Sequence, residues 1–340
     1  MAKRFKSGLV VGKFMPPHMG HVYLINSALA NCEKVYVLAC YTDTEPIDGA
    51  SRFKALKRIF WMTNNLEIIS VDTSHLPQYE SDCDTLDEFY EPWIELIADL
   101  APDIDSVFTS EAYGDDFARY LNVEHFMVDQ ERTKYPISGT EVRKDPFSNF
   151  DMLPPATKRY YQKNVAILGT ESTGKTTLTG KLERHFNSIG ISTGSMREYG
   201  RDYVDTKTTG GWTVEEFEKI AVTHNNLFRT GSLVGVNKLM ISDTEAVVTK
   251  AFADLYMGEN IESKVIDHII KNQVFDKYIL LDIDVPWVDD GTREFPHKRE
   301  EHLNLIKKNL DHYGIDYEVV SGDYNERFEK SLKIIEEMLA

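Results

Sequence analysis

Residues 169–177 read Gly-Thr-Glu-Ser-Thr-Gly-Lys-Thr-Thr, which fits the G-x-x-x-x-G-K-[ST] spacing of a phosphate loop. In such a loop the glycines leave successive backbone N–H groups free to point at phosphate oxygens, and the dipole of the following helix favours negative charge. Lys175 would reach the β- and γ-phosphates, and the Thr176 hydroxyl would hold Mg²⁺. The segment predicts a nucleoside triphosphate site, and its remaining nucleotide-binding candidates are Gly169, Thr170, Glu171, Ser172, Thr173, Gly174 and Thr177.

Two acidic residues later in the chain could serve the same site. Asp243 ends an apolar strand, where an acid would complete the Mg²⁺ shell, although such an Asp also commonly caps the next helix. Glu198 could accept a proton from a substrate hydroxyl, or it could form an ordinary surface pair with a neighbouring arginine. Tyr199 and Arg201 beside it are candidate substrate-binding residues, although Tyr199, like Trp212, is also typical of a packing residue.

A polar segment that begins near Trp287 carries two arginines. Arg293 and Arg299 could close over the transferring phosphoryl group and exclude water, as the lids of small-substrate kinases do. Trp287 could stack on a flat base, and Asp289 or Asp290 could bind ribose hydroxyls. The alternative is a solvated loop with a buried tryptophan.

A second set of candidates follows the first predicted strand, in the segment Gly12-Lys13-Phe14-Met15-Pro16-Pro17-His18-Met19-Gly20-His21. This segment runs from the carboxyl end of a strand into a helix N-terminus, where anions bind favourably. His18 and His21 could donate hydrogen bonds to a phosphate, while Gly20 lets the backbone approach closely. A metal site with both histidines as ligands is the alternative, but no nearby acid or cysteine completes a ligand set.

The segment Ile137-Ser138-Gly139-Thr140-Glu141-Val142-Arg143 follows the last predicted strand of the same half. Ser138 is a suitable helix cap, and with Thr140 and Arg143 it could present hydroxyls and a guanidinium to a triphosphate from the opposite side. A Ser cap followed by Arg is commonly only the start of a helix, so this indication gains its weight from the histidine segment.

Together the two segments resemble the nucleotidyltransferase superfamily, whose members carry an H-x-G-H loop after the first strand and an I-S-x-T-x-x-R signature before the final helix. The resemblance implies that a substrate phosphate attacks the α-phosphate of ATP and that pyrophosphate leaves without a covalent enzyme intermediate. It implies catalytic roles, in stabilising the transition state and the leaving pyrophosphate, for Lys13, His18, His21 and Arg143. It implies nucleotide-binding roles for Gly12, Phe14, Gly20, Ser138 and Thr140.

A transferase of this kind followed by a phosphate-loop domain resembles the NadR-type bifunctional enzymes of NAD salvage, and the likeness includes residues 110–115, 198–201 and 286–293. It implies that the second domain phosphorylates nicotinamide riboside with ATP to the mononucleotide, NMN. The first domain would then join NMN to AMP from ATP, giving NAD and pyrophosphate, with Mg²⁺ accompanying the ATP. Some members carry a DNA-binding module ahead of the first domain. Because the first strand here begins within the first ten residues, we expect no repressor role.

Three alternative functions of the chain stay open. The chain could join another adenylyl or cytidylyl transfer, on a phosphopantetheine or an alcohol phosphate, to its cognate kinase; a base-stacking role of Trp287 would speak against such acceptors. It could be a non-catalytic sensor of NAD or ATP, which the two complete motif sets disfavour. It could be a phosphate-loop ATPase that remodels a partner, but no second ATPase signature is evident.

Alternating strand and helix patterns must position all these groups, and they predict an α/β chain with two tandem doubly wound parallel sheets. In the first half we expect strands at 9–11, 35–39, 67–71, 106–109 and 125–128, with helices at 20–31, 51–63, 85–100 and 114–122. In the second half we expect strands at 165–168, 192–196, 239–242, 278–283 and 317–320. Pro146, Pro154 and Pro155 interrupt the rhythm, so we expect a nucleotidyltransferase domain at 1–150, a linker at 151–163 and a phosphate-loop domain at 164–340.

The composition limits the partners. With 55 acidic against 38 basic residues, the net charge of −17 argues against a duplex nucleic-acid binder. Three cysteines without metal-ligand spacing indicate reduced thiols, and neither a signal peptide nor a membrane-spanning run is evident. We therefore expect a cytoplasmic enzyme whose partners are small molecules (ATP, nicotinamide riboside, NMN and NAD) and neither nucleic acid nor membrane. The oligomeric state stays open, a homo-oligomer included.

Overall fold

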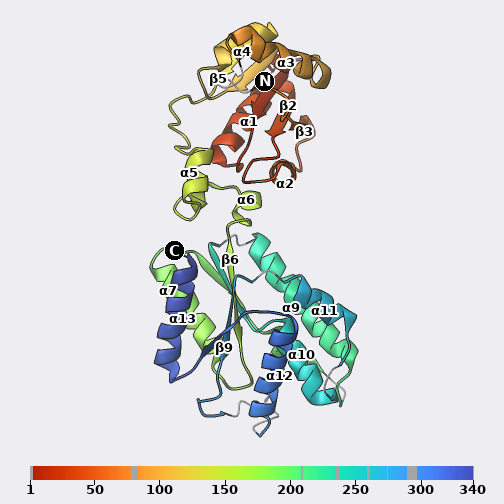
Figure 1. Cartoon of the computed structure of the whole chain (residues 1–340), viewed down its shortest axis with the longest axis vertical. Helices are drawn as coiled ribbons and strands as arrows, with labels where there is room; N and C mark the ends of the chain where they lie inside the picture. Colours follow the sequence, from red (N-terminus) through yellow and green to blue (C-terminus); the bar gives the residue numbers. More distant parts are fainter. Residues whose placement is uncertain are drawn as a thin grey trace. The chain divides into compact units, whose positions relative to one another are not determined.

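The computed structural model of the chain describes residues 3–77, 83–207, 210–234, 237–258, 261–273, 275–288 and 297–339. It divides into two compact units, Met1–Tyr161 and Gln162–Ala340. Each unit contains a five-stranded sheet in which all strand pairs are parallel, with helices packed on both faces (Figure 1). The predicted fold class is confirmed.

In the first unit the strand order is β3–β2–β1–β4–β5. The strands are β1 (Phe5–Gly12), β2 (Cys32–Tyr41), β3 (Leu66–Asp72), β4 (Ser106–Thr109) and β5 (Glu124–Met127). The register pairs Val10 with Val37 on one side of β1 and Leu9 with Val107 on the other. The chain order therefore reverses between β1 and β4, and a doubly wound sheet binds its ligand at the carboxyl ends of the strands beside such a reversal.

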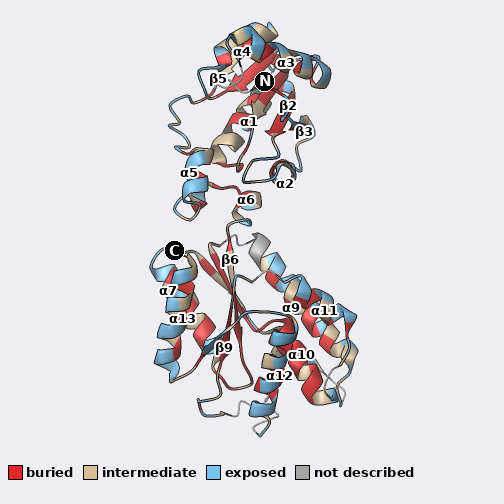
Figure 2. Cartoon of the chain, in the orientation of Figure 1, coloured by how far each residue is buried: buried red, intermediate tan, exposed pale blue. Residues whose placement is uncertain are grey.

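Helices cover both faces of this sheet, because neighbouring residues of each strand point to opposite sides. Val10 packs with residues of α1 and α2, whereas Leu9 packs with residues of α3 and α4, so the central strands are buried on both faces (Figure 2). The helices are α1 (Met19–Asn31), α2 (Gly49–Ile59), α3 (Leu86–Leu100), α4 (Gly114–Leu121), α5 (Gly139–Lys144) and α6 (Pro155–Lys158), with a short 3₁₀ helix at Phe150–Met152.

In the second unit the strand order is β10–β9–β6–β8–β7. The strands are β6 (Lys163–Leu168), β7 (Thr193–Met196), β8 (Leu239–Asp243), β9 (Lys277–Leu281) and β10 (Glu318–Val320). Strand β6 lies between β9 and β8, so the loop after β6 lies beside the carboxyl end of β8. That arrangement brings residues 169–177 close to Asp243.

The same alternation builds two cores in the second unit. Val165 and Ile167 pack against α7 and α13, whereas Ala166 and Leu168 pack with residues of α9 to α12 (Figure 1). The helices are α7 (Lys175–Ser188), α8 (Tyr199–Thr206), α9 (Val214–Val234), α10 (Ala246–Met257), α11 (Lys264–Lys271), α12 (Arg299–His312) and α13 (Tyr324–Leu339).

Small differences from the predicted elements have local causes. Helix α2 begins two residues earlier than expected because the Asp48 side chain caps it, accepting a hydrogen bond from the Ser51 N–H at 2.8 Å. It ends at Ile59 because Phe60 leaves the helical conformation, with φ −110° and ψ 25°. The domain limits expected from the sequence remain predictions, but the segment expected to be a linker contains α6, which packs on α2.

Two further features bear on the composition. Cys32 and Cys40 are free and buried. None of the helices in the described part of the chain has the length and apolarity that crossing a membrane requires.

Candidate active sites

A cavity of about 620 Å³ lies at the carboxyl ends of β1 and β4 in the first unit. The structure brings together here every residue that the sequence assigned to this site, namely Gly12, Lys13, Phe14, His18, Gly20, His21, Ser138, Thr140 and Arg143. Phe14 is buried and has φ 47°, a left-handed conformation that is uncommon outside glycine. This turn connects the end of β1 to His18, which caps α1.

The two histidine rings stack, with centroids 3.7 Å apart and planes inclined by 25°. The His18 main-chain N–H donates to His21 Nδ1 at 3.3 Å, which places the proton of a neutral His21 on Nε2. Burial, helped by the charge of Arg132, lowers the pKa of His18 to about 4. Burial, with His18 and Arg132, also lowers the pKa of His21 well below its ordinary value. Near pH 7 both rings are therefore neutral hydrogen-bonding groups without charge.

No metal-ligand set surrounds these histidines. Across the residues that the structure describes, no three His, Cys, Asp or Glu side chains form a group that could hold a metal ion.

Helix α5 closes the cavity from the opposite side. Ser138 caps it, since its Oγ accepts from the Glu141 N–H at 3.2 Å and donates to Glu141 Oε2 at 2.7 Å. Arg143 Nη1 donates to the Met15 carbonyl at 2.5 Å. At Gly139 an added Cβ would lie 2.7 Å from the same carbonyl oxygen, so a larger residue does not fit without a shift. The two motifs are thus joined directly at Met15.

A buried ion-pair network below Lys13 was not indicated by any motif. Lys13 Nζ lies 2.9 Å from Glu45 Oε1, and Arg52 Nη2 lies 2.6 Å from Glu45 Oε2. Arg52 Nη1 also donates to the Lys13 carbonyl at 2.7 Å and to the Cys40 carbonyl at 3.2 Å. Arg52 therefore fixes the backbone after β1, and Glu45 orients the Lys13 ammonium. From sequence, Arg52 is indistinguishable from an ordinary polar residue of an amphipathic helix.

A second cavity, of about 550 Å³, shares Lys13 and Tyr113 with the first. Helix α3 lines it with Phe89, Tyr90 and Trp93. Trp93 Nε1 is buried and has no hydrogen-bond partner among the residues described, so this donor can serve a ligand. An aromatic wall suits a flat ring. No motif indicates these residues, because aromatic side chains on an amphipathic helix are usually packing residues.

The loop after β6 has the backbone of a phosphate-binding loop. Gly169, Ser172 and Gly174 have φ angles of 151°, 58° and 84°. Lys175 is buried, and its Nζ donates to the carbonyls of Gly169 at 3.0 Å and Thr170 at 2.9 Å. The ammonium therefore lies within the loop, where phosphate oxygens would meet it.

Arg327, which no motif indicated, supports this loop. It is 2% exposed, and it donates to the Thr173 carbonyl at 2.6 Å and to the Asp282 carbonyl at 2.9 Å. It also pairs with Asp284. These contacts join the phosphate loop to the segment after β9.

Oxygen atoms that suit a magnesium ion lie at the end of β8. Thr176 Oγ1 donates to Asp243 Oδ2 at 2.5 Å, and Asp243 Oδ1 is buried with no hydrogen-bond partner in the described part of the chain. Burial raises the pKa of Asp243 to about 6, an effect that Lys175 opposes and Glu198 strengthens. A hydroxyl beside a carboxylate with an unused oxygen suits Mg²⁺, which prefers oxygen ligands.

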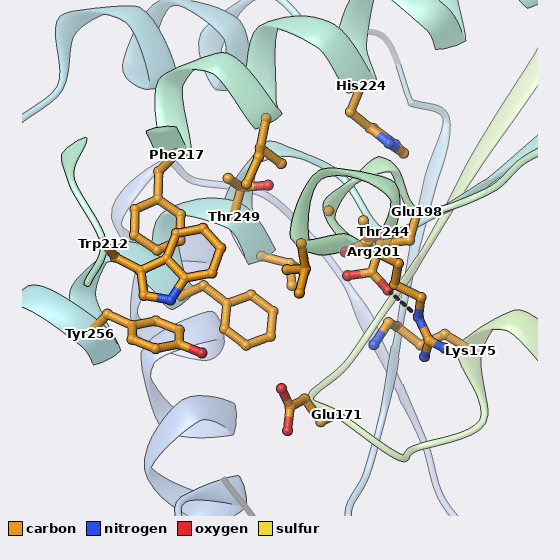
Figure 3. A pocket seen from close by; sticks show the side chains of 15 residues that line it. Glu171, Lys175, Glu198, Arg201, Trp212, Phe217, His224, Thr244, Thr249 and Tyr256 are labelled. Atoms are coloured by element: carbon orange, nitrogen blue, oxygen red, sulfur yellow. Dashed lines mark hydrogen bonds and ion pairs between the residues drawn. The ribbon is translucent and has the colours of Figure 1, made fainter. Parts of the chain in front are cut away.

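A cavity of about 100 Å³ lies beside Lys175 and has an aromatic wall (Figure 3). Trp212 stacks on Phe217, with centroids 4.9 Å apart and planes inclined by 22°. The Tyr256 ring lies 5.3 Å from Trp212. Trp212 directly precedes α9, Phe217 belongs to α9 and Tyr256 belongs to α10, and Glu171 and Lys175 of the phosphate loop line the same cavity.

The polar end of the same cavity holds Glu198 and Arg201 (Figure 3). Arg201 Nε lies 3.5 Å from Glu198 Oε2, and the Glu198 side chain is 16% exposed. Nearby, the buried His224 accepts a hydrogen bond from the Tyr199 N–H at 3.4 Å, and its Nε2 lies 3.0 Å from Ser242 Oγ. Burial lowers the pKa of His224, so it holds the start of α8 against β8 as a neutral ring. The Tyr199 side chain is not among the described lining residues.

Trp212 lines this cavity, whereas Trp287 is absent from the described residues that line it. From sequence, Trp287 is the candidate for stacking on a flat base, and Trp212 is typical of a packing residue. Arg299 begins α12, and its Nη1 donates to the Val285 carbonyl at 3.0 Å. Asp289, Asp290 and Arg293 lie outside the described residues.

Comparisons with known proteins agree with this layout. A family model described as an AAA domain matches residues 164–327. The NadR protein of Escherichia coli (strain K12), a trifunctional NAD biosynthesis and regulator protein, is 31% identical over 351 residues, covering 98% of this chain and 83% of the relative. The crystal structure of a NadR protein in complex with NR has a TM-score of 0.77 at 18% identity, covering 98% of this chain and 96% of that one. A NadR structure in complex with NAD and AMP-PNP has a TM-score of 0.74 at 19% identity, with the same coverage.

Proposed function

This chain belongs to the NadR family of NAD biosynthesis proteins, as its motifs indicated, and on that basis we propose how its two units divide the chemistry. The chain is a bifunctional enzyme of NAD salvage that combines a nicotinamide-nucleotide adenylyltransferase with a ribosylnicotinamide kinase. We assign the kinase to the second unit, where nicotinamide riboside and ATP give NMN. We assign the transferase to the first unit, where NMN and ATP give NAD and pyrophosphate.

One observation carries the assignment. Each phosphate-binding site has an aromatic cavity beside it, with Trp93 and Tyr113 in the first unit and Trp212 and Tyr256 in the second. A flat ring fits both cavities, as expected when the product of one site is the substrate of the other. A phosphopantetheine or an alcohol phosphate carries no flat ring at the acceptor group, so neither would use both walls.

In the first unit the reaction needs alignment and stabilisation of charge but no nucleophile from the protein. The NMN phosphate would attack the α-phosphate of ATP. Nε2–H of His21, together with the ring of His18, donates to oxygens of the reacting phosphates, and Lys13 and Arg143 offset the charge on the leaving pyrophosphate. Ser138 begins α5 at the edge of the same cavity, where a hydroxyl can position the phosphates.

In the second unit the riboside would lie on Trp212 with its hydroxyl toward Glu198. Glu198 accepts the proton as the hydroxyl attacks the γ-phosphate, while Lys175 and the loop N–H groups hold the phosphates. Thr176 and Asp243 would hold Mg²⁺, which neutralises charge on the β- and γ-phosphates. Arg299 lies beside the loop, with its Nη2 at 3.5 Å from the Ser172 carbonyl, and is placed to approach the same phosphates.

The proposed partners are small molecules, with neither nucleic acid nor membrane among them. A cytoplasmic location is part of the proposal and is supported by the free, buried cysteines Cys32 and Cys40. The oligomeric state is left open.

The test is chromatographic analysis of products after incubation with Mg-ATP and either nicotinamide riboside or NMN. The wild-type protein should convert both into NAD. Lys175→Ala should make nothing from the riboside but should still convert NMN, and His21→Ala should stop at NMN.

Lys175→Ala and His21→Ala serve as controls for each other, because each substitution changes only one unit. His75→Ala, on an exposed histidine that lines none of the three cavities, is a matched control and should behave like wild type. A wild-type protein that converts neither substrate would refute the nicotinamide assignment. A Lys175 variant that loses NMN conversion as well would refute the division between the units.

A further inference from the structure

The motif residues around the first cavity supply little positive charge for binding a triphosphate. The neutral histidines can donate hydrogen bonds, but they bring no positive charge to a triphosphate. Of the two cations found by motif, Lys13 is already paired with Glu45 at 2.9 Å, and Arg143 donates to the Met15 carbonyl. A polyanion at this position calls for a further cation.

Arg132 is a cation on the wall of that cavity. His18 and His21 line the same cavity, and the charge of Arg132 lowers the pKa of both rings. Arg132 Nη2 forms an ion pair with Glu111 Oε1 at 3.2 Å, and the two side chains are 41% and 56% exposed. An exposed pair of this kind is weak, so the guanidinium can turn toward an anion at little cost.

The backbone at Arg132 is also unusual. Its φ of 53° is left-handed, a strained conformation for a residue that carries a Cβ. Asp129 holds this turn: its carboxylate accepts from the Thr133 N–H at 2.9 Å, from Thr133 Oγ1 at 2.7 Å and from the Lys134 N–H at 2.9 Å. The Arg132 N–H donates to the Asp129 carbonyl at 2.8 Å. A strained turn that is held so firmly fixes the direction in which Arg132 leaves the chain.

We propose that Arg132 is a catalytic residue of the adenylyl transfer, contacting the β- and γ-phosphates of ATP and stabilising the pyrophosphate as it leaves. The inference rests on the assignment of adenylyl transfer to the first unit. It gives this site three cations from three segments, Lys13 after β1, Arg132 after β5 and Arg143 in α5. Arg132 lies outside both motifs, so the sequence alone does not indicate it.

The experiment measures the reverse reaction, NAD with pyrophosphate to ATP and NMN, because the kinase takes no part in it. In Arg132→Gln, kcat/KM for pyrophosphate should fall about 10- to 100-fold, the range for a lost charge-assisted contact. In the forward direction kcat/KM for ATP should fall by a similar factor, while KM for NMN stays within about threefold. Arg132→Lys should recover part of the loss because it keeps the charge.

Lys134→Gln is the matched control. It removes one positive charge from the same loop, but its exposed side chain is outside the cavity lining, and it should stay within about twofold of wild type. Arg132→Met keeps the aliphatic length, so it guards against a variant that fails to fold, and it should share the loss of Arg132→Gln.

Values of kcat/KM for pyrophosphate and ATP within about threefold of wild type in both neutral variants would overturn the inference. So would a loss that falls on KM for NMN instead. If the wild-type protein forms no NAD from NMN, the proposed function itself fails, and that result is distinct from either.

Discussion

The first unit assembles its phosphate-binding groups from side chains of separate segments, whereas the second takes them mainly from one loop. In the first, Met15 and Arg143 meet although they are 128 residues apart in sequence. In the second, Lys175 donates to carbonyls five and six residues away, and three left-handed backbone positions shape the loop. We therefore expect a triphosphate to be bound mainly by side chains in the first unit and mainly by the backbone of one loop in the second.

This difference predicts where each site is vulnerable. A backbone loop fails when its φ angles are disturbed, because the N–H groups then miss the phosphate oxygens. An assembled site tolerates a small change in one segment, since the other segments keep their own supports. Substitutions of glycine in the two units compare these cases directly.

The largest effect should come from Gly174→Ala. This residue has φ 84°, and an added Cβ would lie 2.9 Å from Tyr324 Cε1, so both strain and contact would displace the loop. Kinase activity should fall about 100-fold, the usual consequence of misplacing a reacting group by an ångström, and NMN conversion should stay at the wild-type level. Steady-state rates for the two half-reactions measure both.

Gly180→Ala on α7 is the control for that change. Its new Cβ would come no closer than 3.4 Å to any atom, here Arg184 Nη1, and alanine is the better helix former. Kinase activity should be retained and the unfolding free energy should rise by about 0.5–1 kcal/mol. If both variants lost activity equally, the loop would not depend on the conformation of Gly174.

Gly20→Ala should have a smaller effect, on the first unit only. Gly20 lies in α1 without a left-handed φ, and its new Cβ would lie 3.0 Å from His18 Nδ1 and Cε1. The ring would have to move by a few tenths of an ångström, so kcat/KM for NMN should fall about 10-fold. A loss as large as that of Gly174→Ala would mean that the first site is as rigid as the second.

The same contrast explains what could be predicted from the sequence. The sequence was sufficient to predict the order of strands and helices and the nine candidate residues around the first cavity. These residues could be predicted because motif residues lie at strand ends that a doubly wound sheet brings together. Arg52, Trp93, Trp212 and Arg327 were missed. Each belongs to an amphipathic helix or precedes one, where only the tertiary packing distinguishes a supporting or ligand-facing side chain from an ordinary one.

Thr157→Val should produce a moderate effect through a support of the first site. Thr157 is fully buried, and its Oγ1 donates to the Pro17 carbonyl, directly before His18, at 2.8 Å. Valine keeps the shape but leaves that carbonyl unpaired, which costs about 1–3 kcal/mol. NMN conversion should fall several-fold in kcat and the melting temperature should drop, while the kinase rate is unchanged. Thr157→Ser should restore both values, and a failure of serine to do so would point to packing and not to the hydrogen bond.

The smallest expected effect is on the protonation of His18, and it can be measured in the fully active protein. If His18 binds phosphate as a neutral ring, its signals should not titrate between pH 8 and about 5.5, because burial holds its pKa at about 4. An ordinary histidine titrates near 6.5. Histidine ring NMR on selectively labelled protein, assigned with His18→Asn and His21→Asn, measures this directly.

The same pKa shift determines how stability depends on pH. Because folding lowers the pKa of His18, the unfolded chain binds the proton at a higher pH than the folded chain does. Acid therefore destabilises the first unit as the pH falls from about 6.5 toward 4. A ring that titrates near 6.5 would be partly protonated near pH 7. The first site would then hold a partly charged histidine where the structure places a neutral one, and the two units would differ only in how far the backbone forms the phosphate site.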